Sequence, residues 1–388
     1  MFRAGYGIFF DIVPRPVSTG GAPFVVNEPS FTNPAAAPVV ILPRVFPESV
    51  GGPRQVGLPQ AVRPDLRTPY STQYNVTIER QQWNTGFRVS YIGTNTRQGE
   101  WGRNINSPVP DTRRFIDKPR PFPNYPAIIF IDNGAGHQYH SLTFEMERRY
   151  ANGFAYQFSY VLAKDIGDLE RGQVAENPFD LARERGNWLD IPRHRLAGYL
   201  LYELPFGKQR RFLTSAHPLV NALAGGWELS IVYQRHSGQF LTPLWTGPDP
   251  TGTAFTSSGT PAQVTIRPNQ VGNPNLPASE RTTARWFDPT AFAPPTPGSF
   301  GTASKGLIHG PGATVWDLGL AKQFDLAGRL RMRWEITGTN ILNTPNWSNP
   351  GTNISSVAQV GVISGVGGVA NLDPSGPRQF RMGIRFDW

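Results

Sequence analysis

Cysteine is absent from the 388 residues of the chain. Without it the chain forms no disulfide, builds no zinc ribbon and offers no thiol nucleophile. The absence does not assign a compartment, because a protein in an oxidising compartment need not use disulfides. A disulfide-stabilised scaffold and a cysteine-dependent enzyme are therefore excluded.

Long apolar runs are missing too. No stretch approaches the roughly 20 apolar residues of a transmembrane helix, and the run at 35–42 already contains Pro38. Helical membrane spanning is excluded, whereas a transmembrane strand is not, because its signal is much weaker per segment. Met1–Tyr6 does not resemble a signal peptide, since no basic start precedes an apolar core.

Charged residues are few, at 17%, and their balance is basic, with a net charge of +9. A basic chain raises nucleic acid as a partner. The arginines are spread along the chain, and the longest basic cluster is only Lys208, Arg210 and Arg211. We therefore expect no nucleic-acid partner.

Glycine and proline are abundant, with 41 and 38 residues, and aromatic residues reach 12%. Glycine and proline cost a helix interior roughly 1 and 3 kcal/mol each, which disfavours a helical protein. Disordered chains are poor in aromatic residues, which disfavours disorder. The composition predicts an all-β protein with many strands and long irregular loops.

Period-two alternation of apolar and polar residues predicts where strands lie, because successive side chains of a strand point to opposite faces. The clearest case is residues 153–165, whose apolar set is Phe154, Tyr156, Phe158, Tyr160 and Leu162. We expect ten strands, near residues 2–12, 71–83, 86–96, 137–149, 153–165, 193–206, 226–236, 313–324, 328–342 and 377–388.

A soluble β-sandwich has alternating strands as well. The clearest runs here are about 10–14 residues long, which exceeds the usual 5–6 and suits a transmembrane strand of about 9–11. Their apolar faces are rich in aromatic rings, as at membrane interfaces. Shifting 329–337 by one residue would put Arg331 and Arg333 into lipid, at about 2–4 kcal/mol each. We therefore favour membrane strands around a wet interior.

The links between these strands alternate in length. The short ones lie near 84–85, 150–152 and 325–327, with a moderate one at 207–225. The long ones are 13–70, 97–136, 166–192, 237–312 and 343–376. Outer-membrane barrels have short periplasmic turns and long extracellular loops. The pattern predicts a transmembrane antiparallel up-and-down β-barrel whose C-terminus lies on the periplasmic side.

No catalytic set emerges from the sequence. His137 and His140 have odd spacing, so they face opposite sides of a strand and do not readily share a metal. Glu145 and Glu147 share a face, but charges on a lumen wall are ordinary in a barrel. Motifs such as H-E-x-x-H and G-x-S-x-G are absent. We expect no enzyme activity, no cofactor and no metal.

The segments 286–292, 310–324, 333–347 and 377–388 resemble the barrel of TonB-dependent outer-membrane receptors, in particular the Oar-like group. Within them, WFDPTAF looks like the family's "FNPxAF" loop, and GPG followed by WDLGL and KQF looks like its "GPG…DLSLxKxF" hairpin. RWE and NILNTPNW look like "RxExFNxFNxPNF", and PRQFRMGIRFDW looks like the closing strand. The resemblance covers essentially the whole chain and is strongest after Trp286.

The family barrel has about 22 strands and follows a plug, an N-terminal domain and a TonB-contacting box. The resemblance therefore implies that residues 1–388 are a C-terminal portion of such a barrel, with the plug and N-terminal domains absent. It implies an outer-membrane transporter barrel for a bulky substrate, with TonB reached only through missing upstream segments. The alternatives are a small closed barrel acting as a surface adhesion protein and a secreted β-rich binding module.

Two groups of residues are candidates for function. The last strand ends in an alternating apolar series that resembles the signal read by the outer-membrane assembly machinery: Phe380, Met382, Ile384, Phe386 and Trp388. A second set would form a basic patch on the lumen wall: Arg329, Arg331, Arg333, Arg381 and Arg385. These arginines either pair with Glu335, Asp317 and Asp387, which we favour, or attract an anionic substrate or a plug.

Overall fold

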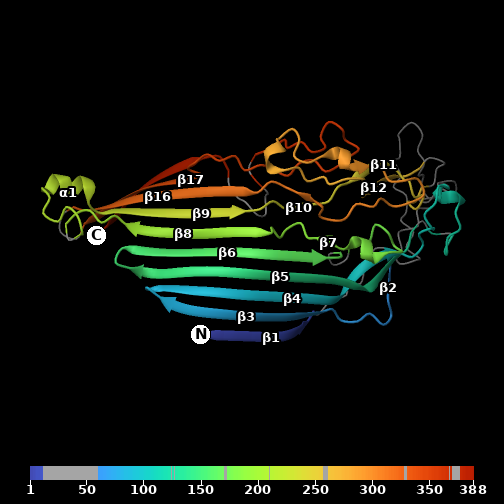
Figure 1. The fold of residues 1–388 in the computed structure, drawn as a ribbon, viewed down its shortest axis with the longest axis horizontal. Helices are drawn as coiled ribbons and strands as arrows, with labels where there is room; N and C mark the ends of the chain where they lie inside the picture. The colour runs from blue at the N-terminus through green and yellow to red at the C-terminus, as the bar shows by residue number, and fades with distance from the viewer. Residues whose placement is uncertain are drawn as a thin grey trace, which may run out of the picture.

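The chain folds into one large antiparallel sheet with a mass of loops at one end (Figure 1). The structure, a computed structural model, describes residues 1–11, 60–123, 125, 127–169, 173–208, 210–256, 261–326, 330–366, 368 and 376–388. No helix in these ranges is long and apolar enough to cross a membrane. The described residues form mainly strands, as the glycine, proline and aromatic content predicts.

All ten predicted strands are present and lie side by side in chain order. They are β1 (Phe2–Phe10), β3 (Tyr70–Gln82), β4 (Thr85–Asn104), β5 (Ile129–Ala151), β6 (Phe154–Gly167), β8 (His194–Glu203), β9 (Trp227–His236), β16 (Ala313–Asp325), β17 (Arg331–Thr339) and β18 (Gln379–Asp387). Two short strands join the extracellular ends of central strands, β2 (Gln60–Val62) on β5 and β7 (Gly186–Asn187) on β6. The up-and-down antiparallel order is confirmed.

The predicted alternation of links is confirmed where the links are described, and most of the link 13–70 lies outside the described residues. The short turns lie at one end, with both chain termini, and the long links lie at the other (Figure 1). The turns at Trp83–Asn84 and Asn152–Gly153 have positive φ at both residues, as two-residue hairpins require. This order places the termini on the periplasmic side and the long loops outside.

Strands β4 and β5 are longer than the sequence predicts. They continue to Asn104 and begin at Ile129, so part of the expected link 97–136 is strand. The pairing shifts between Thr96 and Gly99, next to Gln98 with a φ of 59°. Such a bulge adds an unpaired residue and breaks the period of two, which hides the outer part of each strand.

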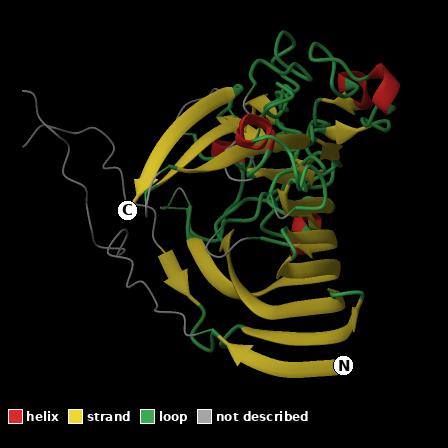
Figure 2. Ribbon diagram, turned by 90° about the vertical axis from the view of Figure 1, so that its left-hand side faces the viewer, coloured by secondary structure: helices red, strands yellow, loops and turns green. Residues whose placement is uncertain are grey.

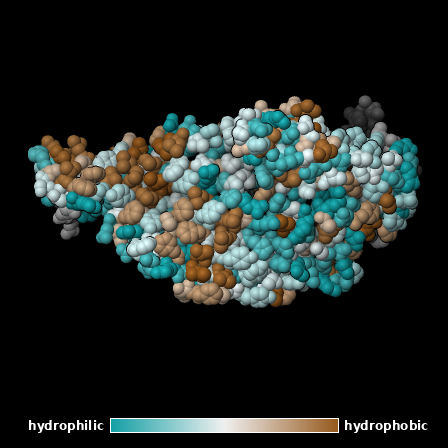
Figure 3. Space-filling view, in the orientation of Figure 1, coloured by the Kyte–Doolittle hydropathy of each residue, from teal (hydrophilic) through white to brown (hydrophobic). Residues whose placement is uncertain are grey.

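The register gives the sheet two different faces. Residues that pair across neighbouring strands share a face, and one continuous face carries Tyr6, Tyr74, Tyr91, Leu142 and Leu162. It continues through apolar residues of β8 to β18. The sheet curves into a trough (Figure 2), and apolar residues gather over its strands in Figure 3. We call this apolar convex side the outward face and the opposite, concave side the lumen face.

The two outer strands of the sheet each pair on one side only among the described residues. Met1 and Glu79 exchange both backbone hydrogen bonds, so the odd residues of β1 point their N–H and C=O groups toward β3. The even residues, such as Ala4, therefore present theirs to the free edge. The backbone N–H of Leu326 donates to the carbonyl of Leu330, so the even residues of β17 point their backbone groups toward β16. Through the pairing of β17 with β18, the even residues of β18 also present their backbone groups to the free edge.

A short helix, α1 (Pro218–Ala224), lies at the periplasmic end of the sheet, within the moderate link (Figure 1). Its last carbonyls accept hydrogen bonds from two outward-facing side chains, Trp227 Nε1 at 2.8 Å and Lys322 Nζ at 2.9 Å, both to Leu223 O. Leu219 and Leu223 of this helix are exposed. The helix is thereby held beside the outward face, with leucines directed to the surroundings.

The extracellular loops form a compact cap with small hydrophobic cores of their own. The larger core contains Leu241, Phe287, Phe292, Ala303 and Ile308. Short pairs of strands order the loop 237–312: β10 (Phe240–Leu241) with β15 (Ile308–His309), β11 (Trp245–Pro248) with β12 (Gln263–Ile266), and β13 (Asn269–Gln270) with β14 (Phe292–Ala293). Packing within the loops therefore gives the extracellular end a defined shape.

Candidate functional site in the lumen wall and the extracellular cap

A ladder of alternating charges crosses the first four strands on the lumen face. Glu79 accepts from Arg3 and from Arg88, at 3.2 and 2.8 Å, and Arg88 also reaches Glu145 at 2.8 Å. A cavity of about 440 Å³ lies beside the ladder and includes Glu147 in its lining. Glu145 is therefore part of an ion-pair network, which fits a structural lumen carboxylate better than a paired acid–base device.

The predicted basic patch lies on the lumen face of the last two strands. Arg333 pairs directly with Arg385 across β17 and β18, and Arg331 and Arg381 share their face. Arg329 lies outside the described residues. The register thus brings together the four described arginines, although their carboxylate partners differ in part from those predicted.

The strongest partner of Arg333 is Glu228, on β9, at 2.8 Å, while Glu335 lies at 3.6 Å. Arg385 binds Asp387 at 2.7 Å. Asp317 accepts a hydrogen bond from the Asn340 backbone at 2.8 Å. This ion pair joins Arg333 on β17 to Glu228 on β9, and the two residues are 105 positions apart in sequence. Local spacing therefore gave no indication of it.

The terminal residues Phe380, Met382, Ile384 and Phe386 share the outward face of β18 and are exposed. Trp388 follows them at 94% exposure. Because β18 is an outer strand of the sheet, these side chains and the free backbone edge are presented together. The structure therefore displays this series along an accessible strand that ends on the periplasmic side.

The two histidines of β5 point to opposite faces, as the spacing predicts. His140 faces outward and pairs across the sheet with Gly93 and Lys164. His137 faces the lumen, where Nε2 lies beside a carboxylate oxygen of Asp165 and the ring packs against Trp188 with ring centroids 4.5 Å apart. Among the described residues, no group of three or more His, Cys, Asp or Glu side chains could hold a metal ion.

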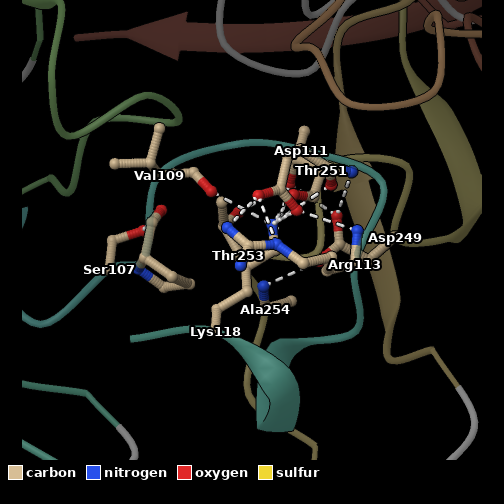
Figure 4. Close-up of polar contacts among 10 residues, drawn as sticks. Ser107, Val109, Asp111, Arg113, Lys118, Asp249, Thr251, Thr253 and Ala254 are labelled. Atoms are coloured by element: carbon tan, nitrogen blue, oxygen red, sulfur yellow. Dashed lines mark hydrogen bonds and ion pairs between the residues drawn. The ribbon is translucent and has the colours of Figure 1, made fainter. Parts of the chain in front are cut away.

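Lys118 joins two extracellular loops (Figure 4). Its side chain is 1% exposed, and Nζ donates to the carbonyls of Val109 and Thr251 at 3.1 and 2.6 Å. It also lies 3.1 Å from a carboxylate oxygen of Asp111. A hydrogen bond from Arg113, supported by Lys118, holds the pKa of Asp111 well below its usual range. The links 97–136 and 237–312 are therefore fastened together at a buried ammonium.

A second buried cation, Arg267, fastens the same long loop to the link 166–192. Its Nε and Nη2 donate to Glu176 and Glu184 at 3.0 and 2.9 Å, and Nη1 donates to the carbonyl of Arg183 at 2.6 Å. The Arg267 side chain is only 4% exposed. Burial raises the pKa of Glu184, with Glu176 adding to the effect and Arg267 opposing it.

A cavity of about 520 Å³ opens among these loops. Charged groups in its lining include Glu176, Glu184, Asp249, Arg267 and Lys305. Threonine hydroxyls and apolar side chains such as Phe300 make up much of the remainder. The cavity has the mixed polar and apolar lining of a small-molecule pocket, within the usual range of about 300–1,000 Å³.

Sequence reasoning missed both buried cations and this cavity. Lys118 lies 133 residues from its partner Thr251, and Arg267 lies 91 residues from Glu176. Single charged residues in glycine- and proline-rich loops look solvated in sequence. Their burial becomes visible only when three long loops are brought together above one sheet.

The comparisons with solved structures give distant likenesses. The outer membrane transporter YddB of Escherichia coli matches with 10% identity and a TM-score of 0.39, over 82% of this chain and 33% of that one. The FrpB iron transporter of Neisseria meningitidis matches with 11% identity and a TM-score of 0.37, over 84% and 32%. The ferric-catecholate import receptor Fiu of E. coli K12 matches with 10% identity and a TM-score of 0.40, over 99% and 32%.

The chain thus spans about a third of the length of each of these three proteins. No curated protein matches the sequence. The family model described as "Outer membrane beta barrel domain" matches residues 1–381, nearly the whole chain. The expected outer-membrane location is thereby confirmed. With its antiparallel sheet, apolar outward face and long extracellular loops, the chain belongs to the outer membrane beta barrel domain family.

Proposed function

We propose that this chain forms part of the barrel of a TonB-dependent receptor that imports a bulky substrate across the outer membrane. In this proposal it supplies wall strands and extracellular loops, and other segments supply the plug and the contact with TonB. It has no catalytic role. The cavity among its loops mixes both signs of charge with hydroxyl and apolar groups.

The open sheet carries this proposal. Among the described residues, β1 and β18 each have one unpaired edge. Unpaired backbone N–H and C=O groups in lipid cost several kcal/mol each, so spanning sheets close on themselves. Additional strands between β18 and β1 would satisfy both edges and widen the lumen. The ordered extracellular cap, with its cavity, would then lie at the mouth of a large barrel.

The lumen arginines fit the wall of such a barrel better than a substrate site. Arg333 and Arg385 are already bound to carboxylates, on β9 and β18. The apolar series on the outward face of β18 is proposed to be recognised by the barrel-assembly machinery. In this proposal the partners of the chain are outer-membrane lipid, the assembly machinery and, through other segments, TonB.

The genomic DNA upstream of the Met1 codon tests the proposal directly. An in-frame plug and TonB box continuous with residue 1 is the expected result. A signal peptide and promoter placed immediately before this codon would contradict it. In that case the chain would be a small barrel in its own right.

The parity of the edges favours that small closed barrel as the second candidate, acting as a surface adhesion protein. Even residues of β1 and β18 both face outward and both direct their backbone groups to the free edge. The two strands could therefore pair without turning a side chain to the wrong face. Because the chain has no cysteine, disulfide cross-linking between Ala4→Cys and a series of β18 cysteines would detect closure cleanly.

A further inference from the structure

The outward face of the sheet carries no carboxylate at the described strand positions that lie on the periplasmic side of the bulge at Gly99. Following the register from β1 to β18, every Asp and Glu on the periplasmic side of that bulge falls on the lumen face or at a strand end. Lysine, arginine and histidine do occur on the outward face. The charge of this surface is therefore of one sign, although the chain has 28 acidic residues.

The outward cations form two rows. The periplasmic row contains Arg80, Arg148 and Lys322, and the extracellular row contains Arg97, His140, Lys164, His194 and Arg235. On β5 the two rows are eight residues apart, from residue 140 to 148. That distance is about 27 Å along a strand and, at a tilt of roughly 40°, about 20 Å across the membrane. The rows therefore lie near the two boundaries of the apolar band.

The extracellular row contains one compact group, which we call the outer cationic patch: His140, Lys164, His194 and Arg235. His140 pairs directly with Lys164 on β6, and His194 pairs with Leu162, two residues from Lys164. Arg235 pairs with Leu196, two residues from His194. Four consecutive strands thus place four nitrogen-bearing side chains on adjoining positions, about 5–8 Å apart between neighbours.

Aromatic rings fix the depth and orientation of this patch. The Nδ1 atom of His140 shares a hydrogen bond with Tyr91 at 2.9 Å, and Nδ1 of His194 shares one with Tyr160 at 2.8 Å. In each pair the two rings are stacked. Tyrosine rings gather at membrane interfaces, where one end is apolar and the other is wet. The patch therefore lies at headgroup level, with Nε2 of each histidine left for another partner.

The two strongest cations of the patch are exposed and unneutralised. Lys164 and Arg235 are exposed and make no ion pair with any described residue. No carboxylate of the described cap residues forms an ion pair with them; Glu176, for example, binds Arg267, and Asp111 binds Lys118. A basic side chain near an anionic membrane surface gains roughly fivefold in binding.

We propose that the outer cationic patch binds the phosphate groups of phosphorylated lipid in the outer leaflet of the outer membrane. Lys164 and Arg235 would hold the phosphates, and His140 and His194 would add hydrogen bonds from the side. The acyl chains of the lipid would lie against the apolar outward face below. This site depends on the outward face alone and is independent of whether the chain takes part in uptake.

Titration of diphosphoryl lipid A into the folded full chain in neutral detergent tests the site. The double variant Lys164→Gln/Arg235→Gln is expected to weaken binding about 30-fold, as two basic side chains are lost. The matched control, Arg195→Gln/Arg381→Gln, removes the same charge from the lumen face; Arg195 directly follows His194. This control should change the affinity less than twofold. If the first double variant does not fold, the two single variants are each expected to lose about fivefold.

Three results would overturn the proposal. Equal binding by the wild type and Lys164→Gln/Arg235→Gln would show that the patch is not used. An equal loss in both double variants would indicate attraction to net charge only. Displacement of the lipid by 10 mM inorganic phosphate would identify a site for a soluble anion. Retained binding in phosphate, together with weak binding of the same lipid after dephosphorylation, would support a lipid site.

Discussion

Replacing Arg267 with methionine should loosen the extracellular cap by a large and measurable amount. Methionine keeps much of the side-chain volume but removes the hydrogen bonds to Glu176, Glu184 and the carbonyl of Arg183. Two carboxylates would then be left in a site where the arginine side chain itself is only 4% exposed. Breaking a buried ion pair from one side costs about 3–5 kcal/mol, because the remaining charge is uncompensated.

The lost free energy should appear as local opening of the extracellular cap. The network around Arg267 joins the link 166–192 to the loop 237–312 and lies outside the membrane strands. A cost of about 3–5 kcal/mol raises the population of the open cap by roughly two to three and a half orders of magnitude. Protease cleavage within these loops, measured on the chain in lipid vesicles, should accelerate accordingly when opening is fast relative to cleavage. Cleavage should occur from the loop side only.

Two further variants test the explanation. Adding Glu184→Gln to Arg267→Met removes one stranded charge and should recover at least tenfold in protection. Arg285→Met breaks an exposed pair with Asp288 in the same loop and should change cleavage less than about fivefold, since surface pairs contribute about 0–1 kcal/mol. Wild-type protection in Arg267→Met, or the same lability in both arginine variants, would refute the reasoning.

Three other perturbations have defined outcomes. Replacing Phe386 and Trp388 by aspartate should lower the amount of protein inserted in the outer membrane; unchanged levels in membrane fractions would contradict an assembly role. Phe158→Arg, on the outward face, should lower the free energy of unfolding in urea by about 2–4 kcal/mol, and Ser159→Arg, on the lumen face, by much less. The folded-state pKa of Asp111 is depressed. The contribution of its carboxylate to the stability of the cap is therefore complete above the ordinary Asp pKa and is lost as pH falls through the lower, folded value. Hydrogen exchange around Lys118 should increase only in acid, and Asp111→Asn should remove this pH dependence.

The strands could be predicted from sequence because lipid imposes a strict rule on one face. Phe154, Tyr156 and Phe158 must alternate with polar residues, since the two sides of β6 meet different solvents. Outside the part of a strand that contacts lipid, alternation is no longer required, and the strand could not be predicted from sequence. The bulge at Gly99 interrupts the period, and the outer parts of β4 and β5 look like loop.

The contacts of the extracellular cap could not be predicted from sequence in this way. Arg267 and Glu184 are ordinary charged residues in sequence, and their burial depends on the simultaneous folding of two loops over the sheet. No periodicity encodes such a contact. The same holds for Arg333 on β17 and Glu228 on β9, which come within reach of each other because β16 lies between the two strands and pairs with both. The lumen location of the arginines was predictable from alternation, whereas their partners required the three-dimensional order of strands.

The spacing of the two outward rows of cations also sets a preference for membrane thickness. Rows about 20 Å apart leave little room for a thick hydrocarbon layer, since basic side chains are costly at mid-bilayer and reach toward the boundaries. A thicker membrane would draw Arg148 or Lys164 into acyl chains unless the lipids thinned locally. Hydrophobic mismatch of this kind costs fractions of a kcal/mol per Å. The protein should therefore fold fastest and sit most stably in short-chain lipids, and it should resist transfer to the thicker bilayers of other compartments.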